Sequence, residues 1–186
     1  MFIAAFFILC FGLSALEGKP KEQKEDPSVG IYKNTLSVVQ NKSNTHLLWF
    51  SRDLRNSLSE CLMSKFLKNT TSGAQRTLEV NFKLNQYSTD SSRHTQAKEN
   101  VTIALKKQTP FPLLSLEGNI DGRWTEEKDL LFGNKNCFVL AALHKPAPRL
   151  SCVVWGFNNK GKSCFDFAKR NCTSGQKVNL TKCEVV

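Results

Sequence analysis

The sequence predicts an all-β domain of about eight antiparallel strands, held by disulfides and carrying one short helix near its C-terminus. Apolar and polar residues alternate with a period of two in several segments, as in half-buried strands. These segments are short and regularly separated by turns, which favours an antiparallel sandwich or an up-and-down barrel. Five cysteines in the last quarter of the 186-residue chain indicate a disulfide framework. They are Cys137, Cys152, Cys164, Cys172 and Cys183.

We expect residues 1–18 to be a secretion signal. The apolar run from Phe2 to Leu13 is too short to span a bilayer, and Ala15 and Gly18 are two plausible cleavage points. No Lys or Arg precedes the run, and the alternatives are an uncleaved anchor or a buried core helix. Cleavage removes Cys10 and leaves six cysteines, an even number that can all pair.

Residues 19–30 are charged and contain proline, so we expect a flexible leader. The remaining residues, 31–186, are long enough for one domain with a buried core. Its first stretch, from Ile31 to Val39, fits either a helical turn or an entry strand, and the two are not separated by the sequence.

The clearest strand signal covers Thr77 to Asn85, and a second covers Val101 to Leu105. Weaker signals cover His46 to Leu54, Cys61 to Leu67, Leu113 to Leu116, Leu130 to Phe132, Phe138 to Leu143, Leu150 to Phe157 and Lys177 to Thr181. Turn-forming residues lie between them, for example Thr71-Ser72-Gly73. The one good helical candidate is Ser163 to Asn171, and a single helix after such strands is typical of a calycin-type barrel.

A family resemblance appears in the cysteine-rich region. Cys152-Val153-Val154-Trp155, followed by Cys164, Phe167, Cys172 and Cys183, resembles the C-terminal signature of tick salivary lipocalins, the histamine-binding protein family. The similarity extends to Asn136–Leu140 and Glu60–Lys65 and covers roughly Thr45 to Cys183. Its specific parts are the cysteine spacing and Trp155.

The resemblance implies an eight-stranded antiparallel lipocalin-type (calycin) barrel. It also implies a pairing that spacing alone cannot select among the fifteen possible connectivities: Cys61–Cys183, Cys137–Cys164 and Cys152–Cys172. A barrel of this size holds one small ligand. The implied function is a secreted salivary protein that sequesters a host mediator, such as histamine, serotonin, a leukotriene or a fatty acid, and so evades host defence without catalysis or cofactor.

The chain departs from the amine-binding members at two positions. Those members resemble one another in carrying acidic residues where this chain has Phe138 and Val153. An ammonium leaves water only when paired, so amine binding by the usual arrangement is in doubt. The other carboxylates considered, each expected to be solvated, are Asp53, Glu60, Glu79, Glu117, Asp121 and Asp129.

An amphipathic anion fits a basic protein with an apolar barrel better, and the formal net charge is +10. We expect Trp49, Phe82 and Trp155 to line the cavity, with ordinary core packing as the alternative for each. Arg52 and Arg123 are candidates to meet a ligand carboxylate, although most arginines are simply exposed.

Sequons begin at Asn41, Asn69, Asn100, Asn171 and Asn179. We expect sugar at several of these asparagines in a secreted protein. Asn171 is the weakest candidate because Cys172 follows it and is expected to form a disulfide.

Other function classes have less support. The three histidines, His46, His94 and His144, are all expected at the surface, and no hydrolase, metalloprotease or zinc-knuckle motif is present. We therefore expect no enzyme and no metal site. No arginine-rich or aromatic-interleaved block predicts nucleic-acid binding, and no later segment predicts a membrane span. We expect the protein to be a monomer. The main alternative function is that of a lipocalin that captures a host protein, such as a complement component, through basic loops at Lys106-Lys107 and Lys160 to Lys162.

Overall fold

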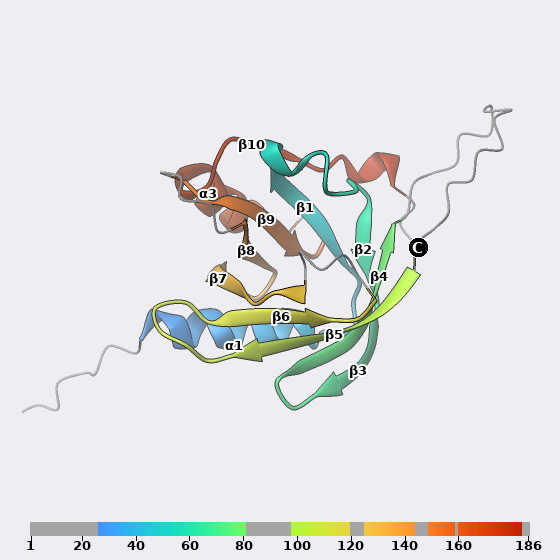
Figure 1. The fold of residues 1–186 in the computed structure, drawn as a ribbon, viewed down its shortest axis with the longest axis vertical. Coiled ribbons are helices and arrows are strands. Elements are labelled where there is room, and N and C mark those ends of the chain that lie inside the picture. Colours follow the sequence, from blue (N-terminus) through green and yellow to red (C-terminus); the bar gives the residue numbers. More distant parts are fainter. Residues whose placement is uncertain (1–25, 81–97, 120–124, 144–148, 159, 184–186) are drawn as a thin grey trace, which may run out of the picture.

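One continuous antiparallel sheet of ten strands dominates the computed structural model, which describes residues 26–80, 98–119, 125–143, 149–158 and 160–183 (Figure 1). The strands are β1 (Thr45–Ser51), β2 (Leu62–Ser64), β3 (Phe66–Thr70), β4 (Gly73–Val80), β5 (Lys98–Lys106), β6 (Leu113–Glu117), β7 (Lys128–Gly133), β8 (Cys137–Leu143), β9 (Ser151–Gly156) and β10 (Gly175–Lys177). Each predicted strand segment in these ranges overlaps a strand, but Lys177 to Thr181 does so only at Lys177. The prediction is wrong for the rest of that segment, where Leu180 begins a 3-10 helix. Residues 81–85 of the clearest predicted strand lie outside the described residues.

The sheet closes on itself because β1 pairs with β9 as well as with β2. His46 shows the closure directly, since its partner is Met63 on one side and Gly156 on the other. The closed path runs β1-β2-β4-β5-β6-β7-β8-β9, while β3 extends the hairpin with β4 and β10 adds to β1. The predicted eight-stranded antiparallel barrel is thus confirmed, and the sandwich alternative is excluded.

Helix α1 (Pro27–Val39) precedes the barrel. The Asp26 carboxylate caps it by accepting a 2.9 Å hydrogen bond from the Ser28 backbone amide, and Pro27 occupies the first turn, where its missing N–H costs nothing. The predicted leader, residues 19–30, is therefore wrong for its last four residues. The undecided stretch from Ile31 is helix rather than strand.

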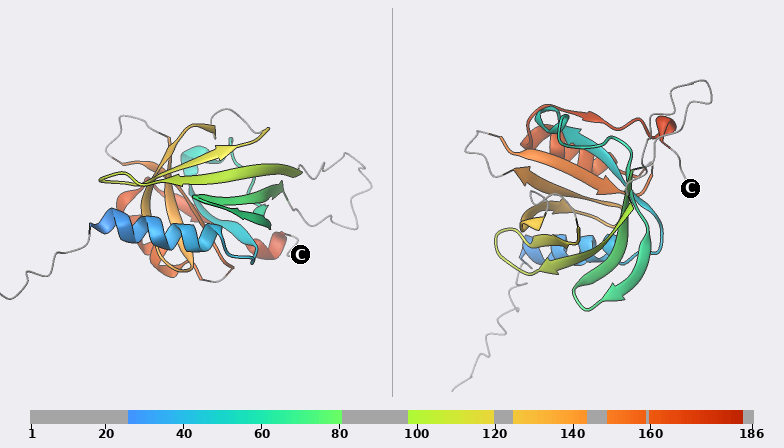
Figure 2. Two further views of the ribbon diagram at one scale, coloured as in Figure 1. Left: turned by 90° about the horizontal axis from the view of Figure 1, so that it is seen from below. Right: turned by 45° about the vertical axis from the view of Figure 1, so that its right-hand side comes forward.

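α1 lies across the end of the barrel where β3 turns into β4 and β7 turns into β8, which we call the base (Figure 2). Gly133, the last residue of β7, permits this approach: a Cβ there would lie 2.6 Å from the Thr35 hydroxyl. The Asn34 amide donates to the Gly133 carbonyl at 3.1 Å, and Gln40 donates to two carbonyls that flank the β3–β4 turn. The helix thereby covers one end of the barrel.

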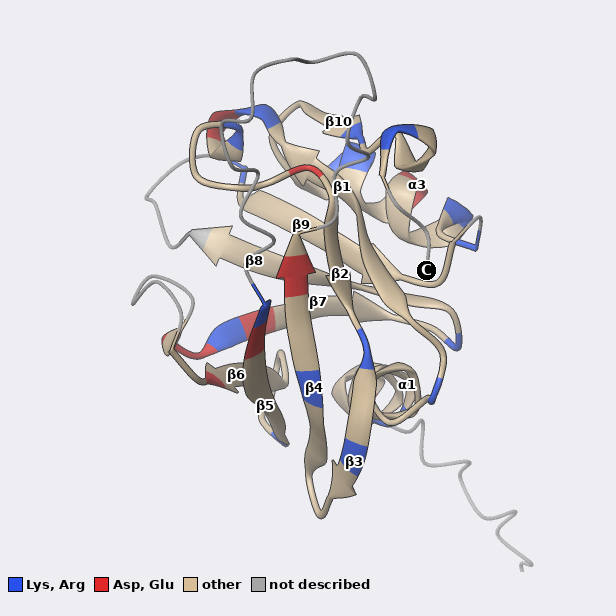
Figure 3. Cartoon of the chain, turned by 90° about the vertical axis from the view of Figure 1, so that its right-hand side faces the viewer, with Lys and Arg blue, Asp and Glu red and all other residues tan. Residues whose placement is uncertain are grey.

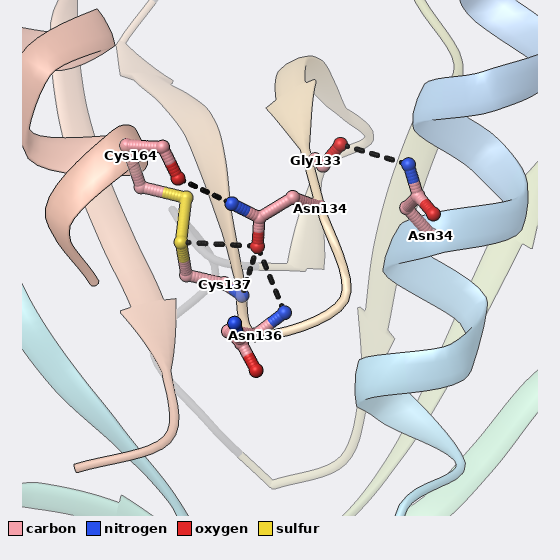
Figure 4. The surroundings of a disulfide bond; sticks show 7 residues. Asn34, Gly133, Asn134, Asn136, Cys137 and Cys164 are labelled. Carbon is pink, nitrogen blue, oxygen red and sulfur yellow. Dashed lines mark hydrogen bonds between the residues drawn. A yellow bond between two sulfur atoms is a disulfide. The ribbon is translucent and has the colours of Figure 1, made fainter. Parts of the chain in front are cut away.

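Helix α3 (Lys162–Asn171) packs on the outside of β7, β8 and β9, within one residue of its predicted start. The Phe132 and Phe167 rings stack with centroids 5.0 Å apart. Figure 4 shows that the β7–β8 turn contacts both helices: the Asn34 amide of α1 donates to the Gly133 carbonyl, and Asn134 Oδ1 accepts from the Cys137 amide. The side-chain amide of Asn134 also donates a hydrogen bond to the Ser163 hydroxyl of α3. Two short 3-10 helices, η1 (Arg52–Leu54) and η2 (Leu180–Lys182), complete the described elements.

Three disulfides are present, and they are the three pairs that the resemblance implies: Cys61–Cys183, Cys137–Cys164 and Cys152–Cys172. The last two join α3 and its end to β8 and β9. The first joins the start of β2 to the C-terminal segment across 122 residues. No helix in the described part of the chain is long and apolar enough to cross a membrane.

The core divides into two clusters that the barrel wall separates. The inner cluster lies inside the barrel and includes Val39, Leu47, Phe50, Phe138 and Val153. The outer cluster lies beneath α3 and includes Trp49, Val139, Val154 and the four cysteines of the α3 disulfides.

Candidate functional site: a cavity inside the barrel

A cavity of about 400 Å³ lies inside the barrel, lined in part by inner-cluster residues such as Val101 and Leu140. Its volume is within the range typical of small-molecule sites. Its wall is apolar and comes from six strands. The main lining residues are Leu62, Leu78, Val101, Leu116, Leu140 and Trp155. The cavity reaches the loops at the end opposite α1, where Ser57, Ser59 and Asn119 line it. We call this end the mouth.

Two hydroxyl residues, Thr45 and Ser64, line the cavity at the base. They face each other across β1 and β2 and are 5% and 4% exposed. The β4 alternation that turns Leu78 and Val80 into the cavity turns Arg76 inward too, next to Ser64. Strand β4 contains one basic residue, Arg76, and one acidic residue, Glu79. Figure 3 shows basic colouring in the middle of this strand and acidic colouring at its end.

Arg76 is 1% exposed, and all five of its N–H groups have acceptors. Nε donates to the Ser64 hydroxyl at 3.0 Å, and Nη2 donates to the carbonyls of Ser64 and Ser43, both at 2.9 Å. Nη1 donates to the carbonyls of Val39 at 2.9 Å and Asn41 at 2.8 Å. A single side chain thus ties the end of α1, the following loop and β2 to β4.

No carboxylate among the described residues pairs with Arg76. All its acceptors are neutral, and its closest ring contact is Phe66, whose centroid lies 5.9 Å from the guanidinium carbon. Burial lowers the pKa of Arg76 to about 10, so the group remains charged at neutral pH. The base of the cavity therefore carries a positive charge that no described counter-ion cancels.

Glu99 lines the cavity on β5, opposite Leu78 and near the mouth. It was absent from the carboxylates considered from the sequence, and so was any role for Arg76. Simple alternation could have found both. Counting back in twos from Val101 reaches Glu99, and counting back from Leu78 reaches Arg76.

The two predicted tryptophans that the structure describes lie on opposite sides of the wall. Trp155 lines the cavity, as expected. Trp49 does not, and this expectation is corrected: it is buried in the outer cluster against Gly175. The cause is a register shift between Leu47 and Trp49, which places Leu48 and Trp49 consecutively on the outer side.

The other predicted ligand residues do not join the cavity among the described side chains. Arg52 is exposed in η1 and does not line it. Phe82 and Arg123 lie outside the described residues. Phe138 and Val153, the apolar replacements for the family's acids, are both buried in the inner cluster. Apolar side chains thus lie inside the barrel at both positions where the resemblance implied acids in amine-binding proteins.

Two expectations of surface exposure are wrong. Glu79 is 6% exposed on the outer face of β4, where it accepts from the Thr77 hydroxyl at 2.7 Å and lies 3.3 Å from Lys65 and 3.7 Å from Lys98. Burial acts to raise the pKa of Glu79, but these hydrogen bonds and charges together lower it. His46 is buried on the outer side of β1, and desolvation lowers its pKa. His94 and His144 lie outside the described residues.

Four of the sequon asparagines are exposed: Asn41, Asn69, Asn100 and Asn179. Asn171 is exposed too, but its amide donates to the Phe167 carbonyl at 2.9 Å, and Cys172 forms a disulfide. Within the described ranges, no group of three or more side chains is arranged to bind a metal ion.

Comparison with solved structures found a protein with a similar fold. No protein-family model matches the chain, and no curated protein matches it. A solved structure, Japanin from Rhipicephalus appendiculatus bound to cholesterol, superimposes with a TM-score of 0.55 at 14% identity, covering 76% of this chain and 94% of Japanin. At this identity the likeness shows the fold alone. With the closed barrel and its helices, it establishes that this chain has the lipocalin-type fold.

Proposed function

We propose that this protein is a secreted lipocalin that sequesters one small, largely apolar host mediator inside its barrel. The observation that carries the proposal is the apolar cavity of about 400 Å³. Burying a ligand against such a wall contributes roughly 25 cal/mol for each Å² of apolar surface removed from water. The function needs no reacting group, because holding the mediator is sufficient to remove it from solution.

A lipid-like ligand fits the wall better than a biogenic amine does. The inner side chains at the two positions where amine binders carry acids are Phe138 and Val153. Glu99 is the one carboxylate that lines the described cavity, and it lies near the mouth rather than deep in the barrel. We therefore place leukotrienes, fatty acids and sterols ahead of histamine and serotonin. Japanin, with the same fold, was solved with a sterol bound.

Secretion and a role in evading host defence belong to the same proposal. The three disulfides support an oxidising compartment, and the exposed sequons are compatible with passage through a secretory pathway. The histamine-binding family and its salivary source are supported by the cysteine pattern and by the shared fold.

The test is a binding panel on the full secreted, oxidised protein. Native mass spectrometry of freshly purified protein should reveal a co-purified lipid, and calorimetry should detect arachidonate, a leukotriene or cholesterol but not histamine. Leu78→Trp fills the cavity and should abolish binding, whereas Leu67→Trp makes the same change on exposed β3 and should leave binding intact.

A protein that stays empty and shows no thermal shift with any lipid or amine would refute sequestration. The alternative of a lipocalin that captures a host protein would then be the better description.

A further inference from the structure

The base of the cavity combines three inward-facing polar residues that the apolar wall does not require. Thr45 and Ser64 line the cavity side by side, and Arg76 lies next to Ser64 on the same face of β4 as Leu78. All three are at least nine-tenths buried. Burial of polar groups at the closed end of an apolar site is costly, so their presence calls for a partner or a use.

All N–H groups of Arg76 have hydrogen-bond acceptors, but no carboxylate among the described residues balances its positive charge. Its five donors end on four carbonyls and one hydroxyl, and the described residues offer it no carboxylate. In a low-dielectric interior, an uncompensated charge acts over several ångströms. Of the residues that accept hydrogen bonds from Arg76, Ser64 is the one that lines the described cavity.

The Ser64 hydroxyl links Arg76 to the cavity. It accepts the Arg76 Nε–H at 3.0 Å, which leaves its own proton for another acceptor, and a hydroxyl that accepts from a cation becomes a stronger donor. Thr45 adds a second hydroxyl, and no hydrogen bond joins its side chain to another residue of the described chain. Two donors and a positive charge thus meet at one point.

We propose that Thr45, Ser64 and Arg76 form a polar end site that receives the hydrogen-bond-accepting end of an apolar ligand, a carboxylate or a hydroxyl, and rejects an ammonium. An ammonium has only donors and carries the same charge as Arg76. The ligand therefore enters with its acceptor end first. This inference rests on the proposed function and specifies the chemistry of the buried end of its ligand.

The experiment uses three probes that share one hydrocarbon chain and differ only at the end: myristate, tetradecanol and tetradecylamine. Cholesterol is added as a bulkier alcohol. Calorimetry on the full secreted protein should rank myristate first, tetradecanol second and tetradecylamine last. We expect about tenfold or more between the first and the last.

Two variants remove the donors, and one provides the control. Thr45→Val replaces a hydroxyl by a methyl group without breaking a described hydrogen bond, and Ser64→Ala removes the hydroxyl that contacts Arg76. Each should weaken myristate binding about three- to tenfold and leave tetradecylamine unchanged or slightly tighter. Ser174→Ala makes the same change on the exposed turn before β10, outside the cavity, and should alter neither. If Ser64→Ala does not fold, Thr45→Val still decides the question.

The outcomes separate this inference from the proposed function. Binding of every probe with equal affinity, or a larger loss with Ser174→Ala than with Thr45→Val, overturns the end site and leaves the cavity as a ligand site. Tighter binding of tetradecylamine than of myristate also overturns it. Absence of binding by all the lipids rejects both proposals together.

Discussion

The two sides of the barrel wall differ in how completely they are filled around β7 and β8. Beneath α3 the outer cluster contains two disulfides, and Val139, Ala141 and Ala168 are fully buried there. On the inner side the wall surrounds a cavity of about 400 Å³. None of the disulfide sulfurs belongs to a residue that lines this cavity. The disulfides and the close packing beneath α3 therefore lie outside the barrel, and the interior can retain space for a ligand.

The disulfides provide the largest predicted effect on this comparison. Replacing Cys61 and Cys183 by alanine opens a loop of 122 residues and should lower the free energy of unfolding by about 5 kcal/mol on the chain-entropy model. The same change at Cys152 and Cys172 opens 20 residues and should cost about 3 kcal/mol. Urea unfolding of the oxidised proteins measures both, and a larger loss for the shorter loop would contradict the prediction.

Arg76 is the strongest constraint on the inner side. Arg76→Met removes the donor from four carbonyls, two of them in buried contacts, and so removes the hydrogen bonds by which Arg76 links the end of α1 and the following loop to β2 and β4. The expected loss in the free energy of unfolding is about 3 kcal/mol or more. Arg52→Met removes an exposed arginine and should change stability by less than about 0.5 kcal/mol. Equal effects of the two substitutions in urea unfolding would show that the Arg76 contacts contribute little.

A matched pair of substitutions tests the difference in filling itself. Leu131→Phe enlarges a side chain in the outer cluster and should destabilise the protein by about 1–3 kcal/mol, because Leu131 is buried and lines no described cavity. Leu140→Phe makes the same change on the neighbouring strand but points into the cavity, so the loss should be below about 1 kcal/mol. Thermal unfolding measures both. The ligand affinity should show the opposite order, with the larger loss at Leu140.

The strands and α3 were predictable because alternation and turn residues report directly on local burial. The disulfide pairing came from the family resemblance, since six cysteines alone leave the choice open. The start of α1 was missed although Asp26-Pro27-Ser28 is a good helix-start signal, because the charge of the preceding leader dominated the interpretation.

The side of the wall on which a residue lies was harder to predict than its strand. Trp155 follows simple alternation and lines the cavity, whereas the register shift before Trp49 reverses its side. A shift of one residue leaves no mark in the composition of the strand. Arg76 and Glu99 obey the alternation, but a charged residue at an inward position is normally taken as the end of a strand rather than as part of a site.

The smallest predicted effect concerns His46, which lies on the outer side of β1 next to inward-facing Thr45 and is 5% exposed. Burial lowers its pKa in the folded protein, so the unfolded chain binds the proton more readily. Stability should therefore be fully present above the ordinary histidine pKa of about 6.5 and should fall as the pH drops through it. Urea unfolding at pH 7.5 and pH 5.5 should show a decrease below about 1 kcal/mol that His46→Gln reduces. If His46→Gln leaves the pH dependence unchanged, the burial of the His46 imidazole does not contribute to that dependence.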